Sequence, residues 1–336
     1  MAPAPDAVST ALRERLAGRF PGAASDVEVP VRLTGGFDFW VYSLHFGGPG
    51  LPAQWAAPLV ARIPAAPERY LQVQQESRLQ DWVAAQGYPA PSLVELVAPG
   101  ELFGSPVQVI SRVPGITMLA AMQAAPWHMR RLTGRLAAAQ AALHRLPAPD
   151  WADSGPEWSL VERQLSLTRR LVELGTDPGL AQALERTERL LPQLEVSEPV
   201  ICHGDFHPGN LLVGGDTVSV IDWTVAGIGD RHGDIARTAW LLRLGAVMTE
   251  KRAERLVLQT LVPGLSRTYL ARYRHELPVD AARLRLWAPV PLLHAWAMTV
   301  ADEQEFFGQS AMSNGSRVRV AAWAQKQFRR RIEGLS

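Results

Sequence analysis

The stretch VICHGDFHPGNLLV, residues 200–213, is the most informative part of this chain. Two apolar runs flank a polar loop in it, and a Gly-Gly pair then leads into a further apolar run that ends in VSVIDW, residues 218–223. Apolar segments on either side of a glycine turn are typical of a β-hairpin. Such a hairpin would bring Asp222 back beside Asn210, so the polar residues of both segments would gather in one place.

The side chains of this stretch carry the oxygen atoms that phosphoryl transfer requires. A carboxylate must accept the proton of the attacking hydroxyl, and hard oxygen ligands must hold Mg²⁺ against the phosphates. Asp205 can supply the base, while Asn210 and Asp222 can supply a neutral and an anionic metal ligand. His203 precedes the loop and would brace its backbone. His207 has two interpretations, a loop-bracing residue or a contact to the acceptor.

The pattern His-Gly-Asp-x-His-Pro-x-Asn, followed by Ile-Asp-Trp, closely resembles the catalytic and metal loops of the aminoglycoside phosphotransferase/choline kinase superfamily. The resemblance implies an α+β, bilobal, protein-kinase-like fold. A small β-rich N-lobe, residues 1–112 with a short N-terminal helix, would bind the nucleotide. A larger, mostly helical C-lobe, residues 113–336, would carry catalysis and acceptor binding. The implied reaction is Mg²⁺-dependent transfer of the γ-phosphate of ATP, with GTP an open alternative, to a hydroxyl of a small molecule. That acceptor would be an antibiotic such as an aminoglycoside, or a metabolite.

Hydrophobic periodicity predicts the same two-part layout. A short helix is expected at residues 7–17, and the β-branched and aromatic residues from Val27 to Phe46 predict two strands joined by a turn. Beyond residue 113 the pattern is helical except at residues 198–222. The other expected elements before the catalytic loop are strands at 59–63, 92–97 and 107–113, and helices at 68–86, 127–146, 158–174 and 180–194.

Residues before the catalytic loop match the family's nucleotide site in their order. Gly35 and Gly36 lie in the expected phosphate-covering hairpin, where adjacent glycines let backbone amides approach phosphate oxygens. Arg62 occupies the place of the family's phosphate-binding lysine, and no lysine precedes the catalytic loop. Because an arginine can bind phosphate through two N–H groups, the resemblance implies that Arg62 contacts the phosphates and forms an ion pair with Glu76.

A hinge and a bracing residue are also implied by the resemblance. Ser111 and Val113 belong to the segment that would connect the lobes and hydrogen-bond the purine through backbone groups. After the metal loop, Asp234 would cap a helix or brace the catalytic loop, and Asp230 is expected to face the acceptor.

The acceptor is expected to contact His207, Asp230 and an acidic face near the C-terminus. There, Asp302 and Glu305 share one helical face with His294, and acidic groups beside the acceptor would attract a cationic amine. The same residues also fit a merely solvated acidic face. Trp287 and Trp296 could instead line an apolar pocket for a larger acceptor.

Composition limits the classes of protein that need to be considered. The 336 residues are 47% hydrophobic and 20% charged with a net charge of +1, which gives no basic field for nucleic acid. No apolar run is long enough to cross a membrane, and the N-terminus has no signal-peptide pattern. The single cysteine, Cys202, cannot form an internal disulfide. We therefore expect a cytoplasmic monomer or homodimer whose partner is a small-molecule hydroxyl acceptor, with no nucleic-acid or membrane partner.

Two other functions remain as alternatives. The chain could be a nucleotide-binding regulatory pseudokinase without turnover, and the replacement of lysine by Arg62 is the only support for that hypothesis. It could also be a metal-dependent hydrolase that uses His203, Asp205 and His207 as ligands, but that hypothesis explains neither Asn210 nor the upstream Gly-Gly pair.

Overall fold

The computed structural model describes residues 2–20, 25–33, 39–65, 69–152, 158–194, 198–303 and 312–335. The chain forms two compact units. The first contains Met1–Gly115 and Ser219–Thr224, and the second contains Ile116–Val218 and Val225–Ser336. The boundary expected between residues 112 and 113 lies close to the end of the first continuous segment. A single boundary cannot describe the two units, however, because residues 219–224 belong to the first unit.

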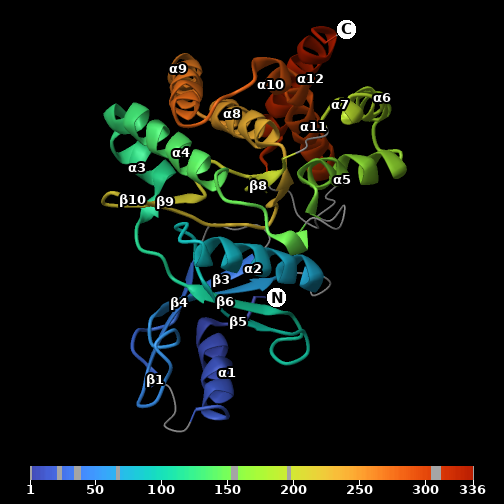
Figure 1. The fold of residues 1–336 in the computed structure, drawn as a ribbon. Coiled ribbons are helices and arrows are strands. Elements are labelled where there is room, and N and C mark those ends of the chain that lie inside the picture. The colour runs from blue at the N-terminus through green and yellow to red at the C-terminus, as the bar shows by residue number, and fades with distance from the viewer. Residues whose placement is uncertain are drawn as a thin grey trace. The chain divides into compact units, whose positions relative to one another are not determined.

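The first unit is a six-stranded antiparallel sheet with two long helices (Figure 1). The strand order is β1-β3-β4-β6-β5, and β2 pairs with β3. The elements are α1 (Pro5–Ala17), β1 (Ser25–Asp26), β2 (Val31–Leu33), β3 (Phe39–Gly47), β4 (Pro58–Pro64), α2 (Tyr70–Ala85), β5 (Leu93–Val97) and β6 (Val107–Ser111).

Strand β4 shows how the two faces of this sheet differ. Because successive side chains of a strand point to opposite faces, its odd-numbered and even-numbered positions have separate surroundings. Leu59, Ala61 and Ile63 belong to the buried cluster that also contains the apolar side of α1. Arg62 points to the other face and pairs in register with Gln108 of β6. The sheet thus packs an apolar core on one side and carries a polar group on the side of α2 (Figure 1).

The second unit is mostly helical. Its strands form two small sheets, a three-stranded one in the order β10-β9-β7 and the antiparallel pair of β8 and β11, and the chain changes unit within β10. Its strands are β7 (Ile116–Thr117), β8 (Val200–Cys202), β9 (Leu211–Gly214), β10 (Thr217–Val220) and β11 (Gly227–Gly229). Its helices are α3 (Met118–Ala124), η2 (Pro126–His128), α4 (Met129–Leu143), η3 (Asp150–Ala152), α5 (Leu160–Glu173), α6 (Pro178–Glu188), α7 (Leu191–Leu194), α8 (Arg231–Met248), α9 (Arg252–Glu276), α10 (Ala281–Trp287), α11 (Pro289–Glu303) and α12 (Asn314–Glu333).

The core of the second unit surrounds α11. Leu293 and Trp296 of this helix belong to one buried cluster with Leu165 of α5 and Phe328 of α12. The predicted helices are confirmed, but the one expected at 180–194 is divided into α6 and α7. Pro192 explains the division, because proline lacks the N–H that a continuous helix would need there and fits only a first turn. Among the described residues, no helix is both long and apolar enough to cross a membrane.

Candidate active site

The predicted catalytic loop begins where β8 ends, and a hydrogen bond between a side chain and the backbone within the loop stabilises its conformation. His203 is fully buried, and its Nδ1 accepts a hydrogen bond from the backbone N–H of Asp205 at 3.2 Å. Gly204 has a φ of +75°, and a Cβ at this position would lie 2.5 Å from the carbonyl oxygen of Val225. A glycine is therefore required there on two grounds. The hydrogen bond at His203 is one that the predicted loop-bracing role needs, and the role itself stays a prediction.

A buried carboxylate on α8 fixes the start of this loop. Asp234 accepts the backbone N–H groups of His203 at 3.1 Å and of Gly204 at 2.8 Å. Its Oδ2 also contacts His144 Nε2 at 3.1 Å and Gln140 Nε2 at 3.0 Å. Burial opposes ionisation, but the hydrogen bonds from His144 and Gln140 outweigh it and lower the pKa of Asp234. Of the two roles predicted for Asp234, the structure shows loop bracing.

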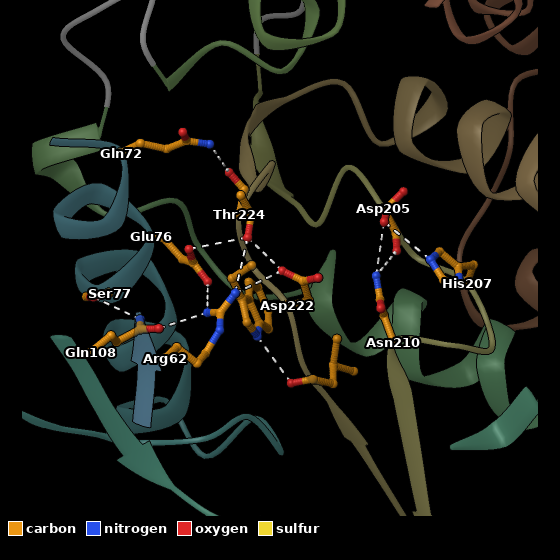
Figure 2. Close-up of polar contacts among 12 residues, drawn as sticks. Arg62, Gln72, Glu76, Ser77, Gln108, Asp205, His207, Asn210, Asp222 and Thr224 are labelled. Atoms are coloured by element: carbon orange, nitrogen blue, oxygen red, sulfur yellow. Dashed lines mark hydrogen bonds and ion pairs between the residues drawn. The ribbon is translucent and has the colours of Figure 1, made fainter. Parts of the chain in front are cut away.

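Asp205 is the carboxylate at the centre of the loop (Figure 2). Its Oδ2 accepts from Asn210 Nδ2 at 3.0 Å and lies 3.3 Å from His207 Nε2, while its Oδ1 lies 3.4 Å from Arg237 Nη2. Burial works against ionisation here too, but the hydrogen bond from His207 and the charge of Arg237 more than offset it, so the pKa of Asp205 is lowered. The carboxylate is consequently ionised and held in one orientation at neutral pH.

The protonation of His207 follows from its contacts. Its Nδ1 accepts the backbone N–H of Gly209 at 3.0 Å, so in the neutral ring the hydrogen is on Nε2 and points to Asp205. Both ring nitrogens therefore act within the loop. Of the two interpretations of His207, these contacts match the bracing one.

In the first unit, the buried Arg62 organises a cluster of polar side chains (Figure 2). It forms an ion pair with Glu76, as the resemblance implies, and its Nη1 also donates to Gln108 Oε1 at 2.8 Å. Its Nη2 lies 3.2 Å from Asp222 Oδ1 and 3.3 Å from Thr224 Oγ1. The guanidinium carbon is 4.2 Å from the centre of the Phe39 ring. Arg62 thus joins a strand, a helix and the metal loop.

The proposed metal ligands have donor atoms that suit a divalent cation. Asp222 adopts a φ of +63°, an uncommon conformation for a residue with a side chain, and its side chain is 46% exposed. Asn210 uses its Nδ2 to donate to the backbone oxygen and carboxylate of Asp205, which leaves the carbonyl oxygen Oδ1 for another partner. An anionic and a neutral oxygen are ligands of the kind that Mg²⁺ prefers.

The remaining predicted nucleotide residues are placed as follows. Gly35 and Gly36 lie outside the described residues. Ser111 is the last residue of β6, and its backbone N–H donates to the carbonyl oxygen of Ser92 at 2.9 Å. Val113 follows this strand and is partly exposed. The expected strand at 107–113 is therefore two residues too long, and the backbone N–H of Ser111 already has a partner.

Two of the acidic residues expected at the acceptor, Asp230 and Asp302, are buried and hydrogen-bonded to other parts of the protein. Asp230 is 3% exposed, caps α8 and accepts from Arg283 Nε at 2.7 Å and Trp287 Nε1 at 2.8 Å. Asp302 is also buried, and its Oδ1 accepts the backbone N–H of Met312 at 3.2 Å. Glu305 lies outside the described residues. Burial of Asp302 contradicts the alternative of a solvated acidic face at this position, and a side chain that packs inward is also poorly placed for long-range attraction of an acceptor.

Sequence reasoning missed Arg237, Gln108 and Thr224, which contact predicted site residues. Arg237 follows Asp234 by three positions, so it lies on the same side of α8, and this spacing was the available signal. Gln108 and Thr224 carried no local signal, because Gln108 meets Arg62 only through the register of β4 and β6. Thr224 is polar and close to Asp222, but its contacts to Arg62 and Glu76 depend on the return of the chain to the first unit.

A model of the phosphotransferase enzyme family matches residues 31–287, well over half of the sequence. The chain belongs to this family. A curated relative, the aminoglycoside 3'-phosphotransferase of Streptomyces fradiae, is 32% identical over 212 residues, which are 60% of this chain and 75% of that protein.

Solved structures of other phosphotransferases share the fold at low sequence identity. A putative aminoglycoside phosphotransferase from Ralstonia eutropha has a TM-score of 0.65 at 16% identity, with 97% of each chain covered. A thermostable mutant of aminoglycoside phosphotransferase APH(4)-Ia, in ternary complex with AMP-PNP and hygromycin B, has a TM-score of 0.57 at 15% identity and covers 96% of this chain and 98% of that one. This phosphotransferase is therefore a small-molecule kinase with an α+β fold, as the resemblance implied.

Proposed function

We propose that this phosphotransferase moves the γ-phosphate of ATP to a hydroxyl group of a small molecule in a Mg²⁺-dependent reaction, with Asp205 as the catalytic base. The observation that carries the proposal is the setting of the Asp205 carboxylate, which Asn210, His207 and Arg237 orient and keep ionised. An oriented anion of this kind can accept the proton of an acceptor hydroxyl as the oxygen attacks phosphorus.

The other residues hold the reactants rather than exchange protons. We assign Asn210 Oδ1 and the Asp222 carboxylate to Mg²⁺, which when bound neutralises charge on the phosphates. Asn210 acts twice, since its Nδ2 also fixes Asp205. His203 and Asp234 keep the backbone of the loop in place, so that the carboxylate of Asp205 does not need to reorganise during transfer. Gly35, Gly36 and Val113 remain our proposed backbone contacts to the nucleotide.

The acceptor is proposed only at the level of its reacting group. The curated relative is named for aminoglycosides, and a similar structure holds hygromycin B, so a hydroxyl of an aminoglycoside antibiotic is the first acceptor to test. A hydroxylated metabolite is the second. Because Asp230 and Asp302 are buried, we do not assign the attraction of a cationic acceptor to them and leave both residues out of the acceptor site. The pseudokinase hypothesis gains no support, because the settings of Asp205 and Asn210 fit turnover.

A coupled assay of ADP release against a panel of acceptors tests the proposal. The panel should contain aminoglycosides, choline and ethanolamine, sugars and hydroxylated amino acids, with ATP or GTP as donor and with Mg²⁺ or EDTA. Acceptor-stimulated, Mg²⁺-dependent ADP release with transfer of ³²P to the acceptor is the expected result. Nucleotide binding with no transfer to any acceptor would favour the regulatory pseudokinase instead.

A cytoplasmic location, a monomeric or dimeric state and the lack of a nucleic-acid partner remain predictions from the sequence.

A further inference from the structure

Arg62 has few N–H groups left for a nucleotide. A guanidinium carries five N–H groups, of which four are on the terminal nitrogens. In this structure Nη1 contacts oxygens of Glu76 and Gln108, and Nη2 contacts oxygens of Asp222 and Thr224. The four terminal N–H groups therefore match four protein oxygens. A phosphate could bind to a terminal nitrogen only by displacing one of these contacts.

The two neutral partners fix how the guanidinium is turned. Gln108 Nε2 donates to Ser77 Oγ at 2.9 Å, and Ser77 Oγ in turn donates to the carbonyl oxygen of Val73 at 2.7 Å. Because these two hydrogen bonds fix the amide nitrogen of Gln108, its Oε1 is the atom that faces Arg62 and accepts from it. Gln108 is fully buried, so its amide has no water to replace these contacts. Gln108 thereby holds one end of the guanidinium plane at a set position over the sheet.

Thr224 fixes the other end and connects it to the metal loop. A hydroxyl has one hydrogen to donate, and the Oγ1 of Thr224 lies 2.6 Å from Asp222 Oδ1 but 3.3 Å from Glu76 Oε2. The hydrogen therefore goes to Asp222, and the same oxygen accepts from Arg62 Nη2. Gln72 Nε2 contacts the backbone oxygen of Thr224 at 3.4 Å. Asp222 Oδ1 is thus held by two donors, Thr224 and Arg62, in a backbone conformation with positive φ.

We propose that Gln108 and Thr224 are positioning residues that direct Arg62 onto Asp222, so that the arginine orients the anionic metal ligand instead of binding the phosphates. This inference rests on the proposed function, in which Asp222 holds Mg²⁺. It explains how an arginine functions where the family has a lysine. A lysine presents three N–H groups from a single atom and cannot span four oxygens on two sides, whereas the planar guanidinium can.

The charges of the cluster agree with this assignment. One guanidinium cation faces two carboxylates, Glu76 and Asp222, so the cluster has an excess of negative charge that a divalent cation would neutralise. Asp222 has its Oδ1 occupied by Thr224 and Arg62. Its Oδ2 makes no hydrogen bond within the described parts of the chain, and this oxygen is the one we assign to the metal.

Nucleotide binding with and without metal tests the proposal without relying on turnover. Calorimetry with AMP-PNP should be run in Mg²⁺ and in EDTA for Thr224→Val, which replaces the hydroxyl with a methyl group of similar size. We expect binding in EDTA to stay within about twofold and binding in Mg²⁺ to weaken about tenfold, the effect of losing one hydrogen bond to a charged group. Thr224→Ser, which keeps the hydroxyl, should restore the Mg²⁺-dependent affinity. Thr217→Val, at an exposed threonine of β10, is the matched control and should change neither affinity.

Variants of Arg62 and Gln108 provide a second test with the same binding measurement. Arg62→Lys should also weaken binding in Mg²⁺ more than in EDTA, and Arg19→Lys at an exposed ion pair is its control. Gln108→Leu should produce the same pattern as Thr224→Val. If Arg62 acts through these residues, Thr224→Val added to Arg62→Lys should weaken binding little further. Circular dichroism of each variant establishes that it is folded, and Thr224→Ser gives a reading if the valine variant does not fold.

Equal weakening in Mg²⁺ and in EDTA for Arg62→Lys would show a direct phosphate contact and would overturn the inference. Unchanged Mg²⁺ dependence in both Thr224→Val and Gln108→Leu would overturn it as well. Asp222→Asn separates this failure from that of the proposed function. If Asp222→Asn leaves the Mg²⁺ dependence unchanged, the metal assignment itself is wrong and the inference falls with it. If Asp222→Asn abolishes the dependence while the positioning variants keep it, only the inference fails.

Discussion

The Asp205 loop and the Arg62 cluster both orient a carboxylate, but they are assembled over very different distances along the chain. Asp205 and Asn210 are five positions apart, and His203 and His207 lie two positions from Asp205. Arg62 instead meets Glu76, Gln108 and Asp222 across 14, 46 and 160 positions. The loop is a local structure that its own spacing defines. The cluster exists only after the sheet has formed and the chain has returned to the first unit.

Because of this difference, we expect loss of a loop residue to be able to stop phosphoryl transfer. Loss of a cluster residue should only weaken the orientation of Asp222. In the loop, one carboxylate is expected to touch the acceptor, and its neighbours keep it in place. In the cluster, both Arg62 and Thr224 donate hydrogen bonds to Asp222, so either one can orient its carboxylate in part. Variants of the loop should therefore span a wider range of effects than variants of the cluster.

The largest effect is expected at Asp205. Asp205→Asn should lower the single-turnover rate by roughly 10²–10⁴-fold, the range typical of a positioned general base. Nucleotide affinity should change little, because asparagine keeps the size of the side chain. Rapid-quench measurement of phosphoryl transfer is the appropriate assay, since product release can limit steady-state turnover. Asp216→Asn, at an exposed turn residue, is the matched control. A variant that kept more than about a tenth of the rate would remove Asp205 from the role of base.

The next largest effect is expected at Asp234, which holds the loop from α8. Asp234→Asn removes the charge and one of the acceptors that the His203 and Gly204 N–H groups now use. Leaving a buried donor without a partner and breaking a buried charged contact should lower the free energy of unfolding by about 2–4 kcal/mol. Urea titration at pH 7, with Asp216→Asn as the control, measures this loss. A decrease below about 1 kcal/mol would mean that the loop is rigid without its support from α8.

The two regions also mark the limit of what the sequence could predict. The contacts of Asp205 with His203 and Asn210 were predictable because glycine, proline and polar residues at fixed spacing leave few local conformations. The pair of Arg62 and Glu76 was predictable through the resemblance. Gln108 was not, because its partner is chosen by strand register, which depends on the packing of a whole sheet face. Asp230 shows the same limit, since its partners Arg283 and Trp287 come from a helix some fifty positions away.

A smaller and pH-dependent effect is expected at Asp230, which contacts neither region. Asp230→Asn weakens the cap of α8 and the contacts to Arg283 and Trp287, so the free energy of unfolding should fall by about 1–3 kcal/mol at pH 7. Burial opposes ionisation, but the hydrogen bonds from His232 outweigh it and lower the pKa of Asp230 below its ordinary value.

The direction of the pH dependence follows from that lowered pKa. A carboxylate with a lower pKa in the folded state stabilises the protein fully above its unfolded pKa, about 3.9, and loses this contribution as the pH falls toward the folded pKa. The difference between wild type and Asp230→Asn should thus stay constant from about pH 8 to pH 5.5 and shrink below about pH 4. Urea titrations at pH 7, 5 and 3.5 measure it. A difference that grew on acidification would contradict the lowered pKa.

The smallest effect is expected at Arg237, whose contact to Asp205 is long at 3.4 Å. The side chain is buried, and its Nε and Nη1 have no hydrogen-bond partner among the described residues. Because a buried cation with incomplete contacts contributes little to stability, Arg237→Met should leave the free energy of unfolding within about 1 kcal/mol of the wild-type value. The single-turnover rate at pH 7.5 should fall by only about three- to tenfold, since Asn210 and His207 still orient the carboxylate. Removing the cation removes one cause of the lowered pKa of Asp205, so this pKa should rise toward its ordinary value and the rate loss should deepen as the pH approaches about 4. Rapid-quench rates at pH 7.5 and pH 5 decide the matter. A loss of more than about a hundredfold at pH 7.5 would place Arg237 in direct contact with a reactant, and the Asp205 loop would then depend on a distant residue as strongly as the Arg62 cluster does.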